Sequence, residues 1–436
     1  MKTLFKNVNL LDGKKDMPIQ EDIDILINDG RIIKIDKNIP VDSQTKVIDL
    51  TNKYAIPGLI NIHSHLIGNG KPQKITEKTP KIIQQQLNNV FGYKIMQKMC
   101  EKSAKIELFS GVTTVRTVGG LADIDAKIKD RINNNKLVGS RLVVSNTAIS
   151  VPHGHMAGTL AYIAHDENEA MAILNKVISS KPDWIKLMVT GGSLDIKEVG
   201  EEGKVLMPLE MVKLLTEKSH QLGYKVSAHI QSLEGIKVCL KANVDSIEHG
   251  ANLDIEAITG LKNGSALIST TAVTSLMANL PITLTKISPI CQKSCQQYLG
   301  NVIQGFKEAV NYDIPIGLGL DNGSPYITHY AMWRELEAFH RYIGVSRNYC
   351  LYLATLSNAK ILGMQKDIGS IEEGKIADLV VVNNNPLEHF KNLEKPHMVI
   401  KQGKIYKNPK FHRNKKLDRV FDLLEKYDQP YVVSGE

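Results

Sequence analysis

The chain has 436 residues, and its hydrophobic fraction of 42% supports a sizeable buried core, which excludes a disordered chain. The formal net charge is +8, but the basic residues are dispersed and form no aromatic-studded stripe, so nucleic-acid binding is not expected. The five cysteines include no C-x-x-C pair, which indicates neither a disulfide framework nor a thiolate zinc cage. Because we find no signal-peptide core and no apolar stretch of membrane-spanning length, we expect a soluble cytoplasmic protein that does not bind membranes.

Both ends of the chain contain short strand-like runs. Residues 23–27 and 31–35 flank the turn Asn28-Asp29-Gly30, a pattern that predicts a β-hairpin. Similar runs return at residues 377–382 and 398–405. We therefore predict that residues 1–56 and 366–407 pair into one small β domain. Residues 408–436 form a C-terminal extension whose basic side chains are typical of a solvated tail rather than of a membrane or polyanion site.

The middle of the chain, residues 57–365, alternates apolar strand-like runs with helical segments such as 171–179, 209–222 and 233–242. This alternation implies a parallel sheet with crossover helices. The candidate strands are residues 59–63, 112–117, 141–146, 184–189, 225–229, 244–248, 266–271 and 314–320. These strands predict an α/β fold with a (β/α)8 TIM barrel, whose active site lies at the carboxyl ends of the strands. A doubly wound sheet is the alternative.

Six residues with metal-binding chemistry end these strands or lie within them. They are His63, His65, Lys186, His229, His249 and Asp321. His63 and His65 are two positions apart on one strand, so their imidazoles point to the same face. A lone buried histidine is more often a hydrogen-bonded core residue than a ligand. The spread over several strand ends, however, favours a metal centre.

Lys186 would share one strand face with Trp184 and Met188, and in a barrel that face can be the interior. An unpaired interior ammonium is costly, so its pKa should fall and the neutral amine becomes a nucleophile. Such an amine can form a Schiff base with a carbonyl substrate or capture carbon dioxide as a carbamate. An edge lysine paired with a carboxylate is the structural alternative. Because a Schiff-base lyase has no need for four histidines and an aspartate, the whole set favours a carbamate that bridges two cations.

With two divalent ions, we expect His63, His65 and Asp321 to hold one ion and His229 and His249 the other, with the Lys186 carbamate and a hydroxide between them. The two ions bring +4 and the carbamate, aspartate and hydroxide bring −3, so such a site is nearly neutral. Asp321 is also the expected catalytic residue, because a ligand with a free oxygen can accept a proton from water and pass it to the leaving nitrogen. Its structural alternative is an N-cap role in the turn that follows.

Five motifs of the chain resemble the amidohydrolase superfamily, and together they cover nearly its whole length. They are PGLINIHSH (57–65), GVTTVR (111–116), IKLMVTGG (185–192), DSIEHG (245–250) and GSIEEGKIADL (369–379). Within the superfamily the chain is most similar to the branch that holds Xaa-Pro dipeptidases (prolidases) and imidazolonepropionase-like enzymes. The resemblance implies a barrel with two zinc or similar ions and an N6-carboxylated Lys186, flanked by a small β-sandwich built from both chain ends.

The motifs also depart from the family pattern at two positions. Asn61 stands where the family usually has Asp, which puts the support of the metal ligands in doubt rather than the ligands themselves. Ser227 stands in place of the first histidine of the more usual His-Ala-His. Superfamily deaminases typically carry a glutamate where this chain has Ser232, so deamination is disfavoured.

We therefore expect a metal-dependent amidohydrolase that hydrolyses a C–N bond through a metal-bridging hydroxide. The expected substrate is a small carboxylate-bearing molecule such as an Xaa-Pro dipeptide or an N-acyl amino acid. The alternatives are a lactonase or phosphotriesterase-type hydrolase on the same metals, a Schiff-base lyase that uses Lys186, and an inactive scaffold.

Substrate contacts are expected from the loops that follow the strands. His155 lies in PHGHMAG (152–158) at a position that resembles the Gly-Gly-His-Gly of the family, where the histidine contacts substrate, and we expect it to bind a carboxylate. His153 and Tyr326 are further candidates, and a third metal at His153 and His155 is a remote alternative. The structural alternatives are a loop histidine that binds backbone and, for Tyr326, core packing. We expect a small-molecule substrate and a homo-oligomer.

Overall fold

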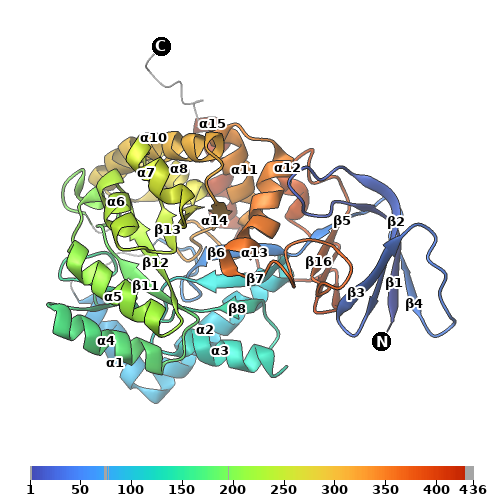
Figure 1. The fold of residues 1–436 in the computed structure, drawn as a ribbon, viewed down its shortest axis with the longest axis horizontal. Coiled ribbons are helices and arrows are strands. Elements are labelled where there is room, and N and C mark those ends of the chain that lie inside the picture. Colours follow the sequence, from blue (N-terminus) through green and yellow to red (C-terminus); the bar gives the residue numbers. More distant parts are fainter. Residues whose placement is uncertain (1, 73–75, 77, 195, 428–436) are drawn as a thin grey trace, which may run out of the picture.

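The structure is a computed structural model that describes residues 2–72, 76, 78–194 and 196–427. Its strands form three sheets, and the long helices lie outside the strands of the two parallel sheets (Figure 1). Within the described residues, no helix is both long enough and apolar enough to cross a membrane.

The eight-stranded sheet combines both ends of the chain, as the sequence predicts. Its order is β18-β17-β16-β5-β1-β2-β3, with β4 paired to β1. Strand β5 runs antiparallel to β16, so that Ile56 lies opposite Val380 and the N-terminal and C-terminal runs share one core. The strands are β1 (Thr3–Leu10), β2 (Gln20–Asn28), β3 (Arg31–Asp36), β4 (Lys46–Asp49), β5 (Tyr54–Pro57), β16 (Leu379–Val382), β17 (Met398–Lys401) and β18 (Lys404–Lys407).

The predicted hairpin is confirmed, since β2 and β3 pair antiparallel around residues 29 and 30. Asp29 and Gly30 both have positive φ, 47° and 80°, which is the conformation of the two-residue turn that matches the twist of a hairpin. Ile23, Ile25 and Ile27 alternate along β2 and are buried in the core of the sheet, as a period of two requires.

The parallel strands form one sheet of three strands and one of seven, and every predicted strand has an observed counterpart. The first sheet contains β6 (Leu59–Ser64), β7 (Val112–Thr117) and β8 (Arg141–Val143). The second has the order β10-β9-β11-β12-β13-β14-β15. Its strands are β9 (Ala148–Ser150), β10 (Ala161–Ile163), β11 (Trp184–Met188), β12 (Lys225–Ile230), β13 (Ser246–His249), β14 (Ala266–Ser269) and β15 (Ile316–Leu318).

The third predicted strand, residues 141–146, is shorter than expected because the backbone bends at Asn146, where φ is 55°. The chain leaves the three-stranded sheet after β8 and resumes as β9, which pairs with β11 in the seven-stranded sheet. Backbone hydrogen bonds continue across the bend, from Ser145 N to the Thr117 oxygen and from Trp184 N to the Val144 oxygen, each 3.2 Å.

The helices confirm the strand–helix alternation, and the three predicted segments correspond to α4, α5 and α6. The helices before the last parallel strand are α1 (Thr79–Asn88), α2 (Val90–Phe109), α3 (Ile124–Asn133), α4 (Glu167–Ser179), α5 (Leu209–Gln221), α6 (Leu233–Lys241), α7 (Ile255–Lys262), α8 (Thr271–Asn279), α9 (Ile282–Thr285) and α10 (Pro289–Asn311). Those after it are α11 (Met332–Ile343), α12 (Arg347–Tyr352), α13 (Asn358–Leu362), α14 (Lys415–Asp422) and α15 (Leu424–Tyr427). Short turns of other helix types lie at Glu201–Gly203, Leu353–Ser357 and Phe390–Leu393.

The expectation of a solvated C-terminal tail is wrong for the described part of the extension. Leu417, Phe421 and Leu424 are buried, because their spacing gives α14 and the start of α15 an apolar stripe. The basic residues Lys415, Lys416 and Arg419 are exposed on the same segment. Its basic composition therefore does not indicate that its apolar face is packed against the protein.

Candidate active site

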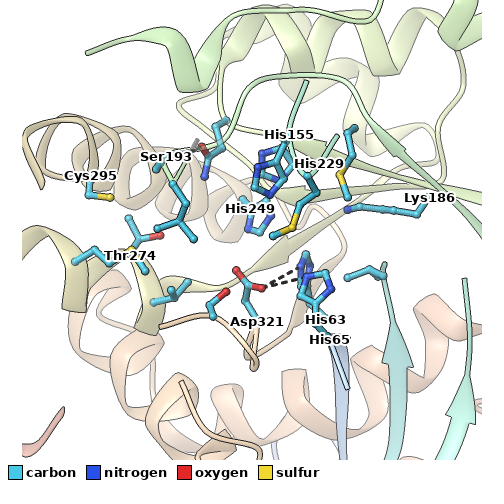
Figure 2. A pocket seen from close by; sticks show the side chains of 18 residues that line it. His63, His65, His155, Lys186, Ser193, His229, His249, Thr274, Cys295 and Asp321 are labelled. Carbon is cyan, nitrogen blue, oxygen red and sulfur yellow. Dashed lines mark hydrogen bonds and ion pairs between the residues drawn. The ribbon is translucent and has the colours of Figure 1, made fainter. Parts of the chain in front are cut away.

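All six predicted metal-binding residues line one cavity at the carboxyl ends of the parallel strands (Figure 2). His63 lies in β6 and His65 follows it, Lys186 lies in β11, and His229 and His249 lie at the ends of β12 and β13. Asp321 follows β15, and its backbone N–H donates to the His63 carbonyl oxygen at 2.9 Å. The parallel strands therefore place residues far apart in the sequence at one site.

His63, His249 and Asp321 form the tightest group of this site. One ligand atom from each lies within 4.8 Å of the others, a spacing at which the three could share a metal ion. Asp321 Oδ1 is 3.4 Å from His65 Nε2 and 3.6 Å from His63 Nε2. The ring of His249 lies between those of His63 and His229, with centroids 4.7 and 4.6 Å away.

Each of the four histidines has one ring nitrogen in a hydrogen bond with a residue of another segment, which fixes the orientation of the ring. The pairs are His63 Nδ1 with Glu248 Oε2 (2.8 Å), His65 Nδ1 with the Gly119 oxygen (2.9 Å), His249 Nδ1 with Thr270 Oγ1 (2.8 Å) and His229 Nε2 with the Gly191 oxygen (2.7 Å). A carbonyl oxygen can only accept, so the held nitrogens of His65 and His229 carry the proton. Their other nitrogens then carry a lone pair that can coordinate a metal.

The electrostatics favour the neutral form of His63, His229 and His249, which is the state a metal requires. Burial lowers the pKa of His63 to about 4, against the opposing effect of Glu248. Burial and neighbouring positive groups hold the pKa values of His229 and His249 well below the ordinary value. Burial opposes ionisation of Asp321, but His65 and His63 hold the pKa of that carboxyl well below its usual range, so it is an anion.

Lys186 projects into the cavity from β11 and is almost completely buried. Its Nζ has no hydrogen-bond partner among the described residues, which is a costly state for a buried ammonium. Burial lowers its pKa to about 8, although Glu248 opposes the shift. An amine in this state is nucleophilic, and its carbamate would supply the oxygen ligands that the histidine cluster lacks. The donor set therefore fits two divalent ions bridged by a carboxylated lysine.

Glu248 and Arg116 are central to the site, and the sequence interpretation gave them no role. Arg116, buried in β7, donates from Nη2 to Glu248 Oε1 at 2.7 Å and from Nε to the Ile62 oxygen at 2.7 Å. Burial opposes ionisation of Glu248, but Arg116, Lys186 and His63 hold its pKa well below the usual range. His249 has a φ of 70°, which breaks the alternation of the strand and lets neighbouring residues 248 and 249 both serve the site. An arginine inside the β-branched run of β7 was the available signal.

Asn61 supplies the support that its departure from the family pattern put in doubt. Its Oδ1 accepts from the backbone N–H of His63 at 3.2 Å and of Leu320 at 3.0 Å, and its Nδ2 donates to Asn322 Oδ1 at 2.9 Å. The amide thus links β6 to the segment after β15, next to both His63 and Asp321.

The structure separates the three predicted substrate-contact residues. His155 lines the cavity, and its ring stacks on that of His229 at 4.1 Å. His153 is exposed at a φ of 63° and lies outside the described cavity lining. The hydroxyl of Tyr326, likewise outside that lining, donates to the oxygens of Leu284 and Thr285 at 2.8 and 3.0 Å.

The rest of the lining was not predicted, because it carries no charged or metal-binding motif. It includes Ser193, whose N and Oγ both donate to Gln231 Oε1 at 3.0 Å. Opposite Lys186, the cavity is bounded by Thr274 of α8 and Cys295 of α10 (Figure 2).

The sequence model of the amidohydrolase family matches residues 54–406, so the chain belongs to this family. A candidate prolidase from Bifidobacterium longum has a similar structure, with 30% identity, a TM-score of 0.86, and coverage of 97% of this chain and 99% of that one. A Xaa-Pro dipeptidase with bound methionine in its active site is 27% identical, with a TM-score of 0.80 and coverage of 93% and 100%. The ochratoxinase of Aspergillus niger is 25% identical over 335 residues, which cover 69% of this chain and 67% of that protein.

Family and site together define the chemical class. The chain has the TIM-barrel-type α/β fold of the family, and it is a hydrolase that acts on C–N bonds of small molecules. Amidohydrolases are typically metal-dependent, in agreement with the group of His63, His249 and Asp321.

Proposed function

We propose that this protein is a binuclear, zinc-dependent amidohydrolase that cleaves the amide bond of a small carboxylate-bearing substrate, either an N-acyl amino acid or an Xaa-Pro dipeptide. The observation that carries the proposal is the amine of Lys186, which has no hydrogen-bond partner among the described residues and lies in a cavity that four histidines also line. The names of the prolidase-type and ochratoxinase relatives support amide hydrolysis.

His63, His65 and Asp321 would hold one ion, and His229 and His249 the other, with carboxylated Lys186 between them. When bound, two such ions lower the pKa of a water molecule and polarise the scissile carbonyl. Asp321, an anion at neutral pH, accepts the proton of the attacking water and delivers it to the leaving nitrogen. His155, stacked on His229, receives the carboxylate of the substrate. Glu248 holds the ring of His63 throughout.

For the architecture, we propose that the two parallel sheets close into one (β/α)8 barrel over residues 57–365. The hydrogen bond from Asp321 N to the His63 oxygen, at the junction of β15 and β6, supports this closure. Residues 1–56 and 366–407 would form the small β-sandwich, and residues 408–436 the C-terminal extension.

The test is to load the purified protein with Zn²⁺ and bicarbonate and measure bound metal and turnover of N-acyl amino acids and Xaa-Pro dipeptides. We expect about two ions per chain, and we expect Lys186→Ala to lose one of them and at least about 100-fold in kcat. Lys225→Ala is the matched control, because Lys225 is exposed at the start of β12, adjacent to β11, and should change neither quantity. Fewer than one ion in the wild type, or undiminished turnover in Lys186→Ala, would overturn the proposal.

Esters, lactones and phosphotriesters belong in the same assay, because the same ligand set can serve those reactions. Preferential turnover of one of them would replace the amide assignment while leaving the metal site intact. Trapping of a carbonyl substrate on Lys186 by borohydride would instead identify a Schiff-base lyase.

A further inference from the structure

Within its described residues, the C-terminal extension packs against α11 and α8, two helices that supply no predicted metal ligand. We use the name C-terminal strap for residues 411–424, which include α14 and the start of α15. Leu417 and Phe421 of the strap are 5% and 6% exposed, and Asn414 caps α14 by accepting from the N–H groups of Lys416 and Leu417. The backbone N–H of Asn414 donates to the hydroxyl of Tyr330 at 2.8 Å, just before α11.

Arg334 is the main attachment point of the strap on α11. Its guanidinium lies 4.4 Å from the ring centroids of both Trp333 and Phe421. Its Nη2 donates to Asp422 Oδ1 at 2.6 Å. Arg334 is 7% exposed, so its contacts with the two rings form in a largely dry environment where a cation–π contact is strong, whereas the side chain of Asp422 is half exposed.

The residue that follows Arg334 connects α11 to α8. Glu335 is fully buried, and its two carboxyl oxygens accept from the backbone N–H groups of Thr271 and Ala272 at 2.8 and 2.7 Å. It also accepts from Ser269 Oγ at 2.8 Å. The first N–H groups of a helix have no partner inside the helix, so Glu335 fixes the start of α8 from outside. Helix α15 also lies against α8.

Helix α8 forms the wall of the cavity that faces away from Lys186. Its residues Val273, Thr274 and Met277 line the cavity, and Thr274 lies at the end opposite Lys186 in Figure 2. Thr270, directly before α8, holds Nδ1 of His249 at 2.8 Å. A displacement of α8 would therefore change the space available to the substrate. Its effect on the five predicted metal ligands other than His249 would be less direct.

We propose that the C-terminal strap positions the substrate wall of the active site and thereby sets which substrates fit. The contacts run from Phe421 and Asp422 to Arg334, from the adjacent Glu335 to the start of α8, and from α8 to the cavity. Phe421 and Asp422 are the positioning residues of the strap, which contributes none of the described cavity lining. This inference rests on the proposed amide hydrolysis at the same site.

The test compares wild type with Phe421→Ala on N-acyl amino acids in which the acyl group grows from acetyl to butyryl to benzoyl. We expect KM to rise about fivefold to tenfold for the bulky acyl group, with kcat for the acetyl substrate within about twofold and the zinc content unchanged. Lys416→Ala is the matched control, because Lys416 is exposed on the same helix and should leave the whole series unchanged. Asp422→Asn removes only the charge of the Arg334 partner, and we expect a smaller shift in the same direction.

Trp333 gives a readout that does not need turnover. We expect the fluorescence emission of Trp333 to shift to longer wavelength in Phe421→Ala, because the substitution removes the ring that packs on Arg334 next to Trp333. The emission of Trp184 should not change, because Trp184 is buried in β11. A uniform change of KM across the acyl series, or none in either Phe421→Ala or Asp422→Asn, would overturn the inference. If wild type hydrolyses no amide at all, the proposed function fails instead. If Phe421→Ala does not fold, the acyl series of Asp422→Asn decides.

Discussion

At the scale of single residues, the site is organised by a buried chain of hydrogen bonds that runs from Arg116 through Glu248 to His63. The charge of Arg116 or of Glu248 alone would be costly to bury, because an uncompensated charge in the interior loses its hydration. Together they satisfy one another: Glu248 accepts from Arg116 with one oxygen and from His63 with the other, at 2.7 and 2.8 Å. The ring of His63 is therefore oriented before any metal binds, which lowers the entropic cost of binding.

This arrangement predicts the effect of Glu248→Gln. A glutamine replaces one of the two accepting oxygens with an NH2 donor, which would face either Arg116 or His63, and it leaves the buried guanidinium without its counter-charge. We expect the affinity for zinc to fall about 10-fold to 100-fold, as is typical for residues that orient metal ligands. The measurement is a competition titration with a chelator. Ser246→Ala is the control, because it removes a hydroxyl that donates to the same carboxylate at 2.7 Å but keeps the charge. Equal zinc affinity in wild type and Glu248→Gln would contradict the orienting role.

At the scale of elements, the sequence predicts the parallel strands well, because their apolar runs are continuous and their ends carry distinctive side chains. It does not predict the break between β8 and β9. That break depends on Asn146, whose Nδ2 donates to the Ser180 oxygen at 2.9 Å and whose Oδ1 accepts from Ala126 N at 3.1 Å. Nor does it predict the role of Glu248, since a regular strand would turn residues 248 and 249 to opposite faces. The positive φ of His249 depends on the tertiary structure, so no periodic pattern in the sequence indicates it.

Helix α6 allows a test of the argument against deamination. Ser232 occupies the position at which superfamily deaminases typically carry a glutamate. In this chain it caps α6 by accepting from Gly235 N at 3.1 Å. It also donates to the Gly203 oxygen at 2.6 Å. We expect Ser232→Ala to lower the free energy of unfolding by about 1 kcal/mol and to leave kcat within about twofold. Urea denaturation and the amide assay measure the two quantities. Ser232→Thr keeps a hydroxyl that can accept from Gly235 N and donate to the Gly203 oxygen, so it should recover stability, whereas loss of turnover in Ser232→Ala alone would point to a chemical role.

At the scale of the whole molecule, the pairing of the two chain ends into one sheet follows from their strand patterns, but the attachment of that sheet to the parallel strands does not. The attachment uses buried polar contacts between segments far apart in the sequence. Arg141 at the start of β8 donates to Asp378 Oδ2 at 2.6 Å, and Lys401 of β17 donates to the Gly139 oxygen at 2.9 Å. Neither Lys401 nor Arg141 differs in local pattern from the exposed basic residues around it, so only the folded chain distinguishes them.

Lys401 makes this attachment sensitive to pH. Burial, aided by the nearby charge of Arg141, lowers its pKa to about 8 from an ordinary value of 10.5. Between these values the unfolded chain binds more protons than the folded chain, so the free energy of unfolding rises with pH. Relative to Lys401→Met, which removes the titration, we expect wild type to be less stable at pH 7 and to gain up to about 1.4 kcal/mol per pH unit above pH 8. Urea denaturation at pH 7, 8.5 and 9.5 measures the difference, in which other titrating groups cancel. Lys407→Met, at an exposed position of β18, should run parallel to wild type at every pH. A constant gap between Lys401→Met and wild type would show that the ammonium of Lys401 carries no burial penalty at this junction.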